Sequence, residues 1–229
     1  MVYLIPTILA EGVTETIPAY VLDAVKQCNV FFVENERSAR RFLKSIWREM
    51  VIDNYQWYAI HKAEDEVLRQ FVAHIKKGDA IGILSEAGCP GIADPGQILV
   101  AKAQELNAIV KPLVGPSSIL LALMGSGMNG QAFFFNGYLP IDAAERRKQL
   151  LLLEEDAIKK NTTQIFIETP FRNDALLKEI LQSCKPTTRL CIAVDITAAT
   201  ESIATKKIEE WKTAIPALHK RPAIFLLGV

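Results

Sequence analysis

Short apolar runs alternate along the chain with longer segments in which apolar residues recur every three or four positions. The short runs are typical of buried β-strands, and the longer periodic segments are typical of amphipathic α-helices. Regular alternation of the two is the sequence form of βαβ units. The pattern therefore predicts an α/β fold.

The first half of the chain contains four such strands, interspersed with helices. We expect strands at residues 2–6, 30–33, 80–84 and 109–113, and helices at residues 17–27, 37–47, 64–76 and 98–106. A further helix is expected after residue 118. The run Val114-Gly115-Pro116-Ser117-Ser118 interrupts the alternation, so we place a domain boundary there. We predict an N-terminal α/β domain at residues 1–114 and a C-terminal α/β domain at residues 115–229.

The second half continues with the same alternation. Strands are expected at residues 133–138, 163–167, 189–194 and 223–227, with a short one near residue 202. Helices are expected at residues 143–158, 173–183 and 207–213. The segment 125–130 matches the dinucleotide fingerprint G-x-G-x-x-G, but it follows a helix and precedes a strand. We therefore interpret it as a helix end and a loop.

Composition and charge limit the classes of partner. Lys plus Arg and Asp plus Glu both number 26, so the formal net charge is zero and any RNA-binding surface must be local. The four cysteines form no CxxC pair and the three histidines are scattered, so we expect neither a metal site nor disulfides. Reduced thiols are typical of a cytoplasmic protein. No targeting segment and no run of membrane-spanning length is expected.

The most informative segment is the loop at residues 85–96, which follows the predicted strand at 80–84. It contains three glycines, two prolines and two acids within twelve residues. Glycines let a backbone approach a ligand closely, and the carboxyl ends of strands in an open α/β sheet are where ligands bind. The alternative is an ordinary connection rich in turns.

Three other segments combine a strand end with polar chemistry. Ser117 and Ser118 begin a helix, where hydroxyls either cap the helix or bind a ligand. Residues 34–41 and 168–172 join acids to arginines after a strand. Such clusters are either solvated helix ends or anchors for a substrate phosphate.

Taken in order, these segments resemble the tetrapyrrole methylase superfamily of S-adenosylmethionine (SAM) methyltransferases. Within it, they are most similar to the branch that methylates a cytidine 2′-hydroxyl of small-subunit ribosomal RNA. The resemblance is carried by residues 33–37 with Arg40, 84–96, 112–118, 135–140, 167–172 and 197–201. Its most specific part is the element Ala-Gly-x-Pro-x-x-x-Asp-Pro-Gly at residues 87–96, followed by Gly-Pro-Ser at residues 115–117.

The resemblance implies two α/β domains with a SAM cleft between them, usually in a homodimer, and RNA as the substrate. The N-terminal domain then carries the acceptor side and the first cofactor loop, and the C-terminal domain completes the SAM site. The residues that it assigns to the cofactor are Ser85, Glu86, Ala87, Gly88, Ser117, Ser118, Glu168, Ile196 and Ala223.

Methyl transfer to a ribose hydroxyl needs a group that draws away the proton. The candidates on strand-end loops are Glu34, Glu86 and Asp94, and the candidate substrate anchors are Arg37, Arg40 and Arg172. In this branch the loop after the first strand is rich in glycine, whereas residues 6–12 here keep Pro6 and have a single glycine. We therefore keep two alternatives: a methylase of a tetrapyrrole or protein acceptor, and a non-catalytic module that binds SAM or RNA.

Overall fold

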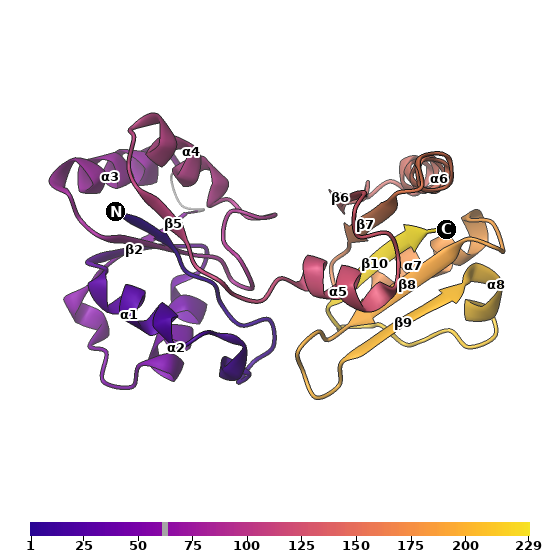
Figure 1. Ribbon diagram of the computed structural model, residues 1–229, viewed down its shortest axis with the longest axis horizontal. Helices are drawn as coiled ribbons and strands as arrows, with labels where there is room; N and C mark the ends of the chain where they lie inside the picture. The colour runs from indigo at the N-terminus through magenta and orange to yellow at the C-terminus, as the bar shows by residue number, and fades with distance from the viewer. Residues whose placement is uncertain (61–63) are drawn as a thin grey trace. The chain divides into compact units, whose positions relative to one another are not determined.

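The fold was determined from a computed structural model that describes residues 1–60 and 64–229. The chain divides into two compact units, Met1–Ser117 (unit 1) and Ser118–Val229 (unit 2) (Figure 1). This division falls three residues after residue 114, where the sequence pattern places it. Both units are α/β, as the alternation of apolar patterns predicts.

Unit 1 is built on a parallel sheet with the strand order β3-β2-β4-β1-β5. The strands are β1 (Val2–Leu4), β2 (Val30–Val33), β3 (Gln56–Ala59), β4 (Ile81–Leu84) and β5 (Val110–Pro112). The helices are α1 (Tyr20–Gln27), α2 (Glu36–Ile46), α3 (Glu64–Lys77) and α4 (Gln97–Glu105), with short 3-10 helices at Thr14–Thr16 and Ile52–Asn54.

The two faces of this sheet are covered by different helices. Buried residues of α1 and α2 pack on one face, and those of α3 and α4 pack on the other. Every residue of β2 and β4 is buried, which explains why these strands are continuous apolar runs. Asn35 begins α2, because its Oδ1 accepts the backbone N–H groups of Arg37 (2.9 Å) and Ser38 (3.3 Å).

Two details of unit 1 differ from the sequence expectations. Helix α1 begins at Tyr20, after residue 17, where we expected it to start. The pattern also does not predict β3, a partly exposed edge strand. This strand is stabilised by cross-strand packing on β2, because Trp57 stacks on Phe31 and Tyr58 stacks on Phe32, each with ring centroids 4.8 Å apart.

Unit 2 has a mixed sheet with the strand order β6-β7-β10-β8-β9. Strands β6 and β7 are parallel, and the other neighbours are antiparallel. The strands are β6 (Phe133–Tyr138), β7 (Thr163–Ile167), β8 (Arg189–Val194), β9 (Ser202–Lys207) and β10 (Ala223–Gly228). The helices are α5 (Ser118–Ser126), α6 (Ala143–Lys160), α7 (Asn173–Ser183) and α8 (Ile208–Trp211).

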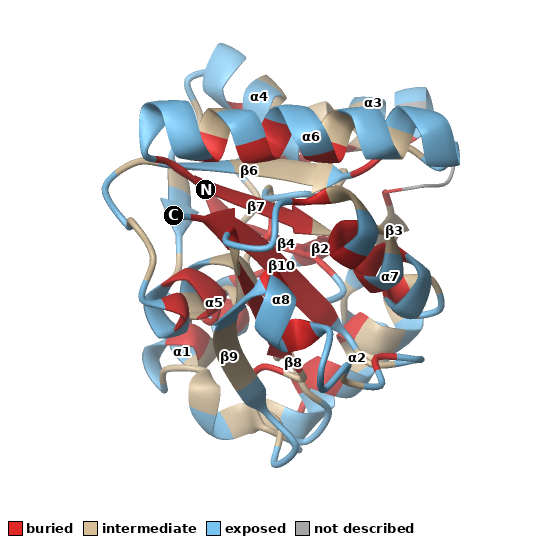
Figure 2. Cartoon of the chain, turned by 90° about the vertical axis from the view of Figure 1, so that its right-hand side faces the viewer, coloured by how far each residue is buried: buried red, intermediate tan, exposed pale blue. Residues whose placement is uncertain are grey.

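The core of unit 2 lies between the sheet and helices α6, α7 and α8. Figure 2 shows β7 and β10 as largely buried, while α6 and α7 each present an exposed face. Helix α5 ends at Ser126, and Gly127 follows with φ of 65°. This confirms that the G-x-G-x-x-G match is a helix end and a loop that leads into β6.

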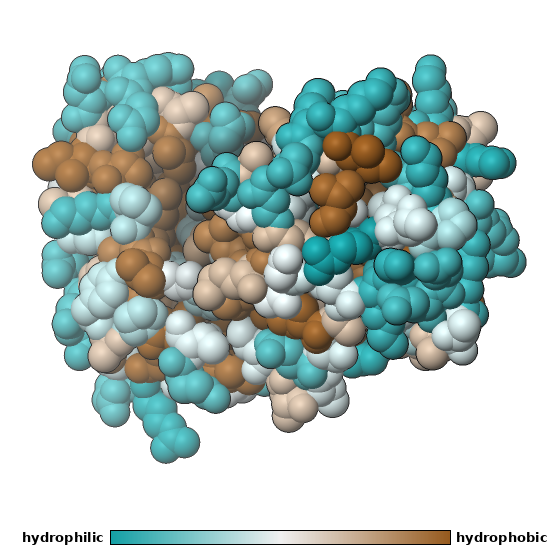
Figure 3. Space-filling view, turned by 45° about the vertical axis from the view of Figure 1, so that its right-hand side comes forward, coloured by the Kyte–Doolittle hydropathy of each residue, from teal (hydrophilic) through white to brown (hydrophobic). Residues whose placement is uncertain are grey.

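The surface combines hydrophilic side chains with separate apolar patches on the face seen in Figure 3. Among residues 1–60 and 64–229, none of the helices combines the length and the apolar composition that a membrane crossing requires.

Candidate functional site

Loops from three neighbouring strands meet at one edge of the unit 1 sheet. Strand β4 lies between β1 and β2, and all three end at this edge. The chain leaves β1 and β2 for the face covered by α1 and α2, but it leaves β4 for the opposite face, covered by α4. Neighbouring strands whose loops leave towards opposite faces open a crevice, which is where α/β sheets bind ligands.

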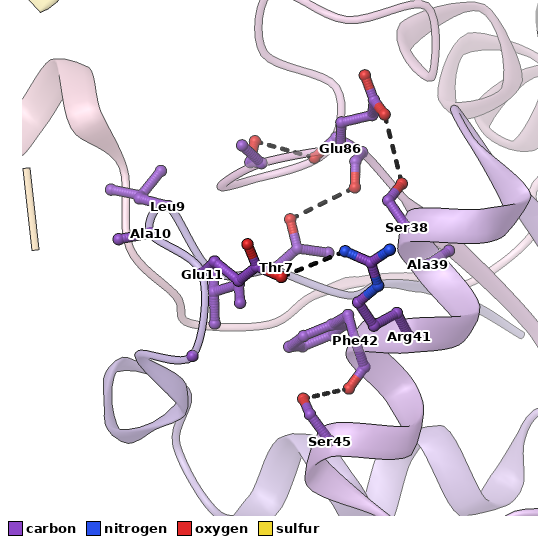
Figure 4. Close-up of a pocket in the computed structure, with 14 residues that line it drawn as sticks. Thr7, Leu9, Ala10, Glu11, Ser38, Ala39, Arg41, Phe42, Ser45 and Glu86 are labelled. Atoms are coloured by element: carbon purple, nitrogen blue, oxygen red, sulfur yellow. Dashed lines mark hydrogen bonds and ion pairs between the residues drawn. The ribbon is translucent and has the colours of Figure 1, made fainter. Parts of the chain in front are cut away.

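A pocket of about 370 Å³ lies at this edge (Figure 4). It is formed by the loop after β1, one face of α2 and the start of the loop after β4. Its lining residues are Thr7, Ile8, Leu9, Ala10, Glu11, Gly12, Ser38, Ala39, Arg41, Phe42, Ser45, Ser85, Glu86 and Ala87. Three predicted cofactor residues, Ser85, Glu86 and Ala87, are therefore part of this pocket.

The loop after β4 is joined to the loop after β1 at Gly88. The Thr7 N–H donates to the Gly88 carbonyl (2.9 Å), and the Thr7 hydroxyl donates to the Ser85 carbonyl (3.4 Å). Gly88 has φ of 75°, and a Cβ there would lie 3.3 Å from the Pro116 carbonyl oxygen. The loop thus needs glycine at this position both for its backbone conformation and for its contact with the Gly-Pro-Ser segment.

The Gly-Pro-Ser segment also packs on the loop after β1. A Cβ at Gly115 would lie 2.1 Å from the Cβ of Pro6, so only glycine fits there. The Cys89 thiol donates to the Pro116 carbonyl oxygen (3.4 Å). The two motifs, which lie apart in the sequence, are in direct contact in unit 1.

The three candidate catalytic carboxylates have different surroundings. Glu34 Oε2 accepts the backbone N–H of Glu86 (2.8 Å), which ties the end of β2 to the loop after β4. Glu86 is a lining residue of the pocket, and its exposed carboxylate accepts the Ser38 hydroxyl at Oε1 (3.4 Å). Glu86 is thus the candidate that lies at the pocket with an exposed carboxylate.

Both oxygens of Asp94 are engaged within its own loop. Oδ2 accepts the Gly91 N–H and Oδ1 accepts the Gly96 N–H, each at 2.7 Å. Burial raises the pKa of Asp94 above its ordinary value, although these amides act in the opposite direction. Asp94 therefore organises the loop that carries the motif.

The arginines of α2 point to different places. Arg41 lines the pocket, and its Nη1 lies 3.2 Å from Glu11 Oε1, as Figure 4 shows. Arg40 pairs with Glu36 (2.8 Å) and lies over the Trp57 ring, with its Cζ 5.0 Å from the ring centroid. Arg37 lies instead beside a separate hollow at the ends of β2 and β3.

Arg41 and Glu11 are residues that we did not single out from the sequence. A helical signal was nevertheless available. Ser38, Arg41, Phe42 and Ser45 recur at the three- and four-residue spacing of one helix face, and all four line the pocket. The loop partner, Glu11, carries no comparable local signal.

Three of the predicted cofactor residues of unit 2 gather at one edge of its sheet. Ala223 pairs with Val194, and Ile224 pairs with Ile167, so the start of β10 lies between the ends of β7 and β8. Glu168 is the first residue after β7, and Ile196 is the second residue after β8. The sheet therefore brings together Glu168, Ile196 and Ala223.

At this edge of unit 2, Glu168 is held by two contacts, and Thr197 has a buried hydroxyl without a partner among the described residues. Glu168 is 5% exposed, and its Oε1 accepts the Thr169 N–H and pairs with Arg172 Nη2, both at 2.6 Å. Thr197 has φ of 74°, and its buried hydroxyl has no hydrogen-bond partner among the described residues. An unpartnered buried hydroxyl is a free contact for a ligand.

Ser117 and Ser118 lie at the division between the units. Helix α5 begins at Ser118, so Ser117 directly precedes the first helical residue. Within residues 1–60 and 64–229, no group of three or more His, Cys, Asp and Glu side chains is arranged to hold a metal ion.

Comparison with protein-family models gives a match over most of the chain. The model of the tetrapyrrole (corrin/porphyrin) methylases matches residues 11–212.

Curated relatives named ribosomal RNA small subunit methyltransferase I are similar in sequence to this chain. The ribosomal RNA small subunit methyltransferase I of Neisseria meningitidis is 31% identical over 67% of this chain, and the chain spans about half (51%) of that protein's length. The protein of the same name from Buchnera aphidicola is 29% identical over 99% of this chain and 77% of its own length.

Solved structures share the fold. The uroporphyrin-III C-methyltransferase of Thermus thermophilus, solved as a complex with S-adenosylhomocysteine, aligns with a TM-score of 0.56. The two chains are 18% identical, and the alignment covers 99% of this chain and 96% of that one.

Proposed function

The chain belongs to the tetrapyrrole (corrin/porphyrin) methylase family, and we propose that it is a SAM-dependent methyltransferase whose acceptor is a ribose 2′-hydroxyl of ribosomal RNA. The observation that carries the choice of acceptor is the similarity to proteins named ribosomal RNA small subunit methyltransferase I, which extends over 99% of this chain in one case.

The residues present fit SAM as the cofactor. The loop after β4 presents its backbone at an open pocket, and Thr197 offers a buried hydroxyl with no partner among the described residues. Bound SAM supplies a methyl group made electrophilic by its sulfonium sulfur. The residues proposed to hold it are Ser85, Glu86, Ala87, Gly88 and Ser117 in unit 1, and Ser118, Glu168, Ile196 and Ala223 in unit 2.

The pocket of unit 1 is suited to position the acceptor. Methyl transfer is an in-line displacement, so the protein has to hold the hydroxyl in line and exclude water. Phe42 and Leu9 supply apolar walls against which a nucleoside can pack. The exposed ion pair of Arg41 with Glu11 is weak, so a substrate phosphate can replace Glu11 on Arg41.

Glu86 is the proposed proton acceptor. Glu86 is a lining residue of the pocket with an exposed carboxylate, and its backbone is held by Glu34, whose Oε2 accepts the Glu86 N–H. In this arrangement Glu86 takes the proton of the ribose hydroxyl, Glu34 positions Glu86, and Asp94 maintains the loop.

A local basic surface supports an RNA substrate despite the zero net charge of the chain. Arg147, Lys148 and Lys178 line a groove between α6 and α7. The acid in this groove, Glu179, is paired with Arg146. The groove therefore keeps an excess of positive charge that phosphates can neutralise.

The decisive experiment is methyl transfer from radiolabelled SAM to small ribosomal subunits isolated from cells that lack this gene. Nucleoside mass spectrometry then identifies the product. We expect a 2′-O-methylated nucleoside that is absent without the protein. Subunits that gain no methyl group, together with an unchanged nucleoside profile in the cells, would contradict the RNA assignment.

A tetrapyrrole acceptor is the alternative favoured by the apolar side chains of the pocket, which include Ile8, Leu9 and Phe42. Methyl transfer to uroporphyrinogen III in the same assay, without transfer to RNA, would support it. Tight SAM binding without transfer to any acceptor would instead indicate a non-catalytic module.

We also propose a homodimer in the cytoplasm. The dimer rests on the family resemblance, and sedimentation equilibrium would test it. The cytoplasmic location is supported by the four cysteines, all of which are free thiols.

A further inference from the structure

One aromatic side chain at the functional edge of unit 2 is strongly exposed. Phe171 follows β7 in the loop that leads to α7, and 69% of its surface is exposed. Phenylalanine is among the residues most often buried, and this exposed ring lies beside a candidate site. The core of unit 2 does not use this ring.

The Phe171 ring lies beside two side chains of a second loop, His219 and Lys220. Lys220 Nζ lies 5.9 Å from the Phe171 ring centroid. The His219 ring stands edge-on to it, with centroids 6.0 Å apart and an interplanar angle of 77°. We name Phe171, His219 and Lys220 the aromatic platform.

Buried polar side chains fix the two loops that form this platform. The Lys220 N–H donates to the Pro170 carbonyl (3.0 Å), and Lys220 itself is held at φ of 62°. Asn173 is fully buried, and its Nδ2 donates to the Arg221 carbonyl (2.7 Å). A loop whose backbone is already held in place loses less conformational entropy when a ligand binds to it.

The platform lies at the edge that holds Glu168, Ile196 and Ala223. A second exposed aromatic, Tyr138, ends the neighbouring strand β6 and is 59% exposed. Its register partner on β7 is Ile167, next to Glu168. Exposed aromatics thus accompany the ends of two parallel strands at this edge.

We propose that Phe171 stacks on an unpaired base of the RNA substrate, while Lys220 contacts the adjoining phosphate. This inference rests on the proposed function and extends it to a substrate subsite. Proteins that bind single-stranded RNA combine exposed aromatic rings with nearby cations in this way. The acids close to the platform are already engaged, because Glu168 pairs with Arg172 and Asp174 Oδ1 accepts the Leu218 N–H.

The charge of the platform favours RNA over an apolar partner. Lys220 places a cation over the ring, and Arg172, whose charge is paired with Glu168, keeps a buried Nε without a partner among the described residues. A phosphate next to a stacked base can pair with Lys220, whereas an apolar partner would leave that charge without compensation.

The test measures binding of a single-stranded oligoribonucleotide that contains 2-aminopurine, whose fluorescence reports stacking. We expect F171A to weaken binding about ten-fold and F171W to bind like the wild type. K220Q should lower the slope of log affinity against log salt by about 0.7, the value for one phosphate contact on a single strand. F134A is the matched control, because Phe134 is an exposed aromatic in the first half of β6.

Two further measurements separate this proposal from the proposed function. SAM affinity, measured by calorimetry, should be unchanged in F171A, and its methyl transfer to small ribosomal subunits should show a raised KM. If the wild type methylates RNA but F171A has the same oligonucleotide affinity and KM, the stacking proposal fails and the proposed function stands. If the wild type neither binds the oligonucleotide nor methylates RNA, both fail.

Discussion

Three carboxylates on the strand-end loops of unit 1 differ in what they can do. Glu86 lies at the pocket, Glu34 accepts the backbone N–H of Glu86, and Asp94 accepts the amides of Gly91 and Gly96. Each is an acid after a strand in the sequence, but Asp94, whose oxygens both accept backbone N–H groups, is poorly placed to take a substrate proton. These contacts support our proposal that Glu86 takes the proton while Glu34 and Asp94 hold the loop.

Substitution of these residues should divide their roles. We expect Glu86→Gln to lower kcat about 100-fold or more, the usual contribution of a general base, with SAM affinity retained. Glu34→Gln keeps an oxygen that can accept the Glu86 N–H and should cost less activity than Glu34→Ala. The measurement is steady-state methyl transfer, with Glu105→Gln, at the exposed end of α4, as the control.

Equal activity of Glu86→Gln and wild type would remove Glu86 as the proton acceptor. A larger loss in Glu34→Gln than in Glu86→Gln would transfer that role to Glu34.

Asp94 should make the stability of the protein depend on pH in an unusual direction. Burial raises its folded pKa above 3.8, the ordinary value, so the folded state holds a proton that the unfolded state releases. The stabilisation is complete below pH 3.8 and is lost as the pH rises through the raised pKa. Urea unfolding of wild type and Asp94→Asn between acid and neutral pH should show the wild type losing its relative stability in this window.

A wild type that instead gains stability over Asp94→Asn as the pH rises would show that the amides of Gly91 and Gly96 outweigh burial.

At the scale of elements, a buried acid on α6 joins that helix to the segment before β8. Glu154 is 3% exposed, and its Oε1 accepts the Lys185 N–H (2.7 Å) and the Thr188 hydroxyl. Helix α6 therefore packs on the sheet through Leu150 and Leu153 and is also tied to the segment before β8 through these hydrogen bonds. The sequence pattern identifies the apolar face of α6 but not this connection.

Removing this acid should destabilise unit 2. We expect Glu154→Ala to lower the free energy of unfolding by about 3 kcal/mol, because it leaves the buried Thr188 hydroxyl and the Lys185 N–H without this partner. The neighbouring Glu155→Ala removes only an exposed pair with Lys159 and should leave the urea midpoint unchanged. Equal midpoints for the two variants would contradict the structural role of Glu154.

At the scale of the whole molecule, zero net charge means that RNA affinity has to come from local surfaces. The groove between α6 and α7 is one of them, with Arg147, Lys148 and Lys178 in its lining. Other lysines of the same helix, Lys159 and Lys160, are engaged in ion pairs at its C-terminal end. Helix α6 thus carries candidate RNA contacts, and its paired lysines Lys159 and Lys160 can serve as control positions.

Neutralising the groove should weaken RNA binding in a salt-dependent way. For the triple variant Arg147→Gln, Lys148→Gln and Lys178→Gln, we expect the slope of log affinity against log salt to fall by about 2, since each phosphate contact on a single strand contributes about 0.7. The double variant Lys159→Gln and Lys160→Gln should keep the wild-type slope. Identical slopes in all three proteins would exclude the groove as a phosphate contact.

Much of the fold and part of the site could be predicted from the sequence. The strand-end loop at residues 85–96 and the Gly-Pro-Ser segment are local, because positive φ at Gly88 and close backbone approach at Gly115 demand glycine whatever surrounds them. The spacing at which apolar residues recur along the chain likewise predicts most of the strands and helices. Strand β3 was missed because its stabilisation comes from rings on β2, which no local pattern records.

The sequence by itself determined the α/β class, the motifs and the family, since these depend on backbone conformation and on apolar spacing within short segments. Only the tertiary structure decided which side chains share a pocket. Thr7, Ser38 and Ser85 lie far apart in the chain, and the strand order β2-β4-β1 brings them together. Arg41 rather than Arg40 lines the pocket, because Arg41 lies on the same face of α2 as Ser38 and Phe42, and the strand order sets that face beside the loops after β1 and β4.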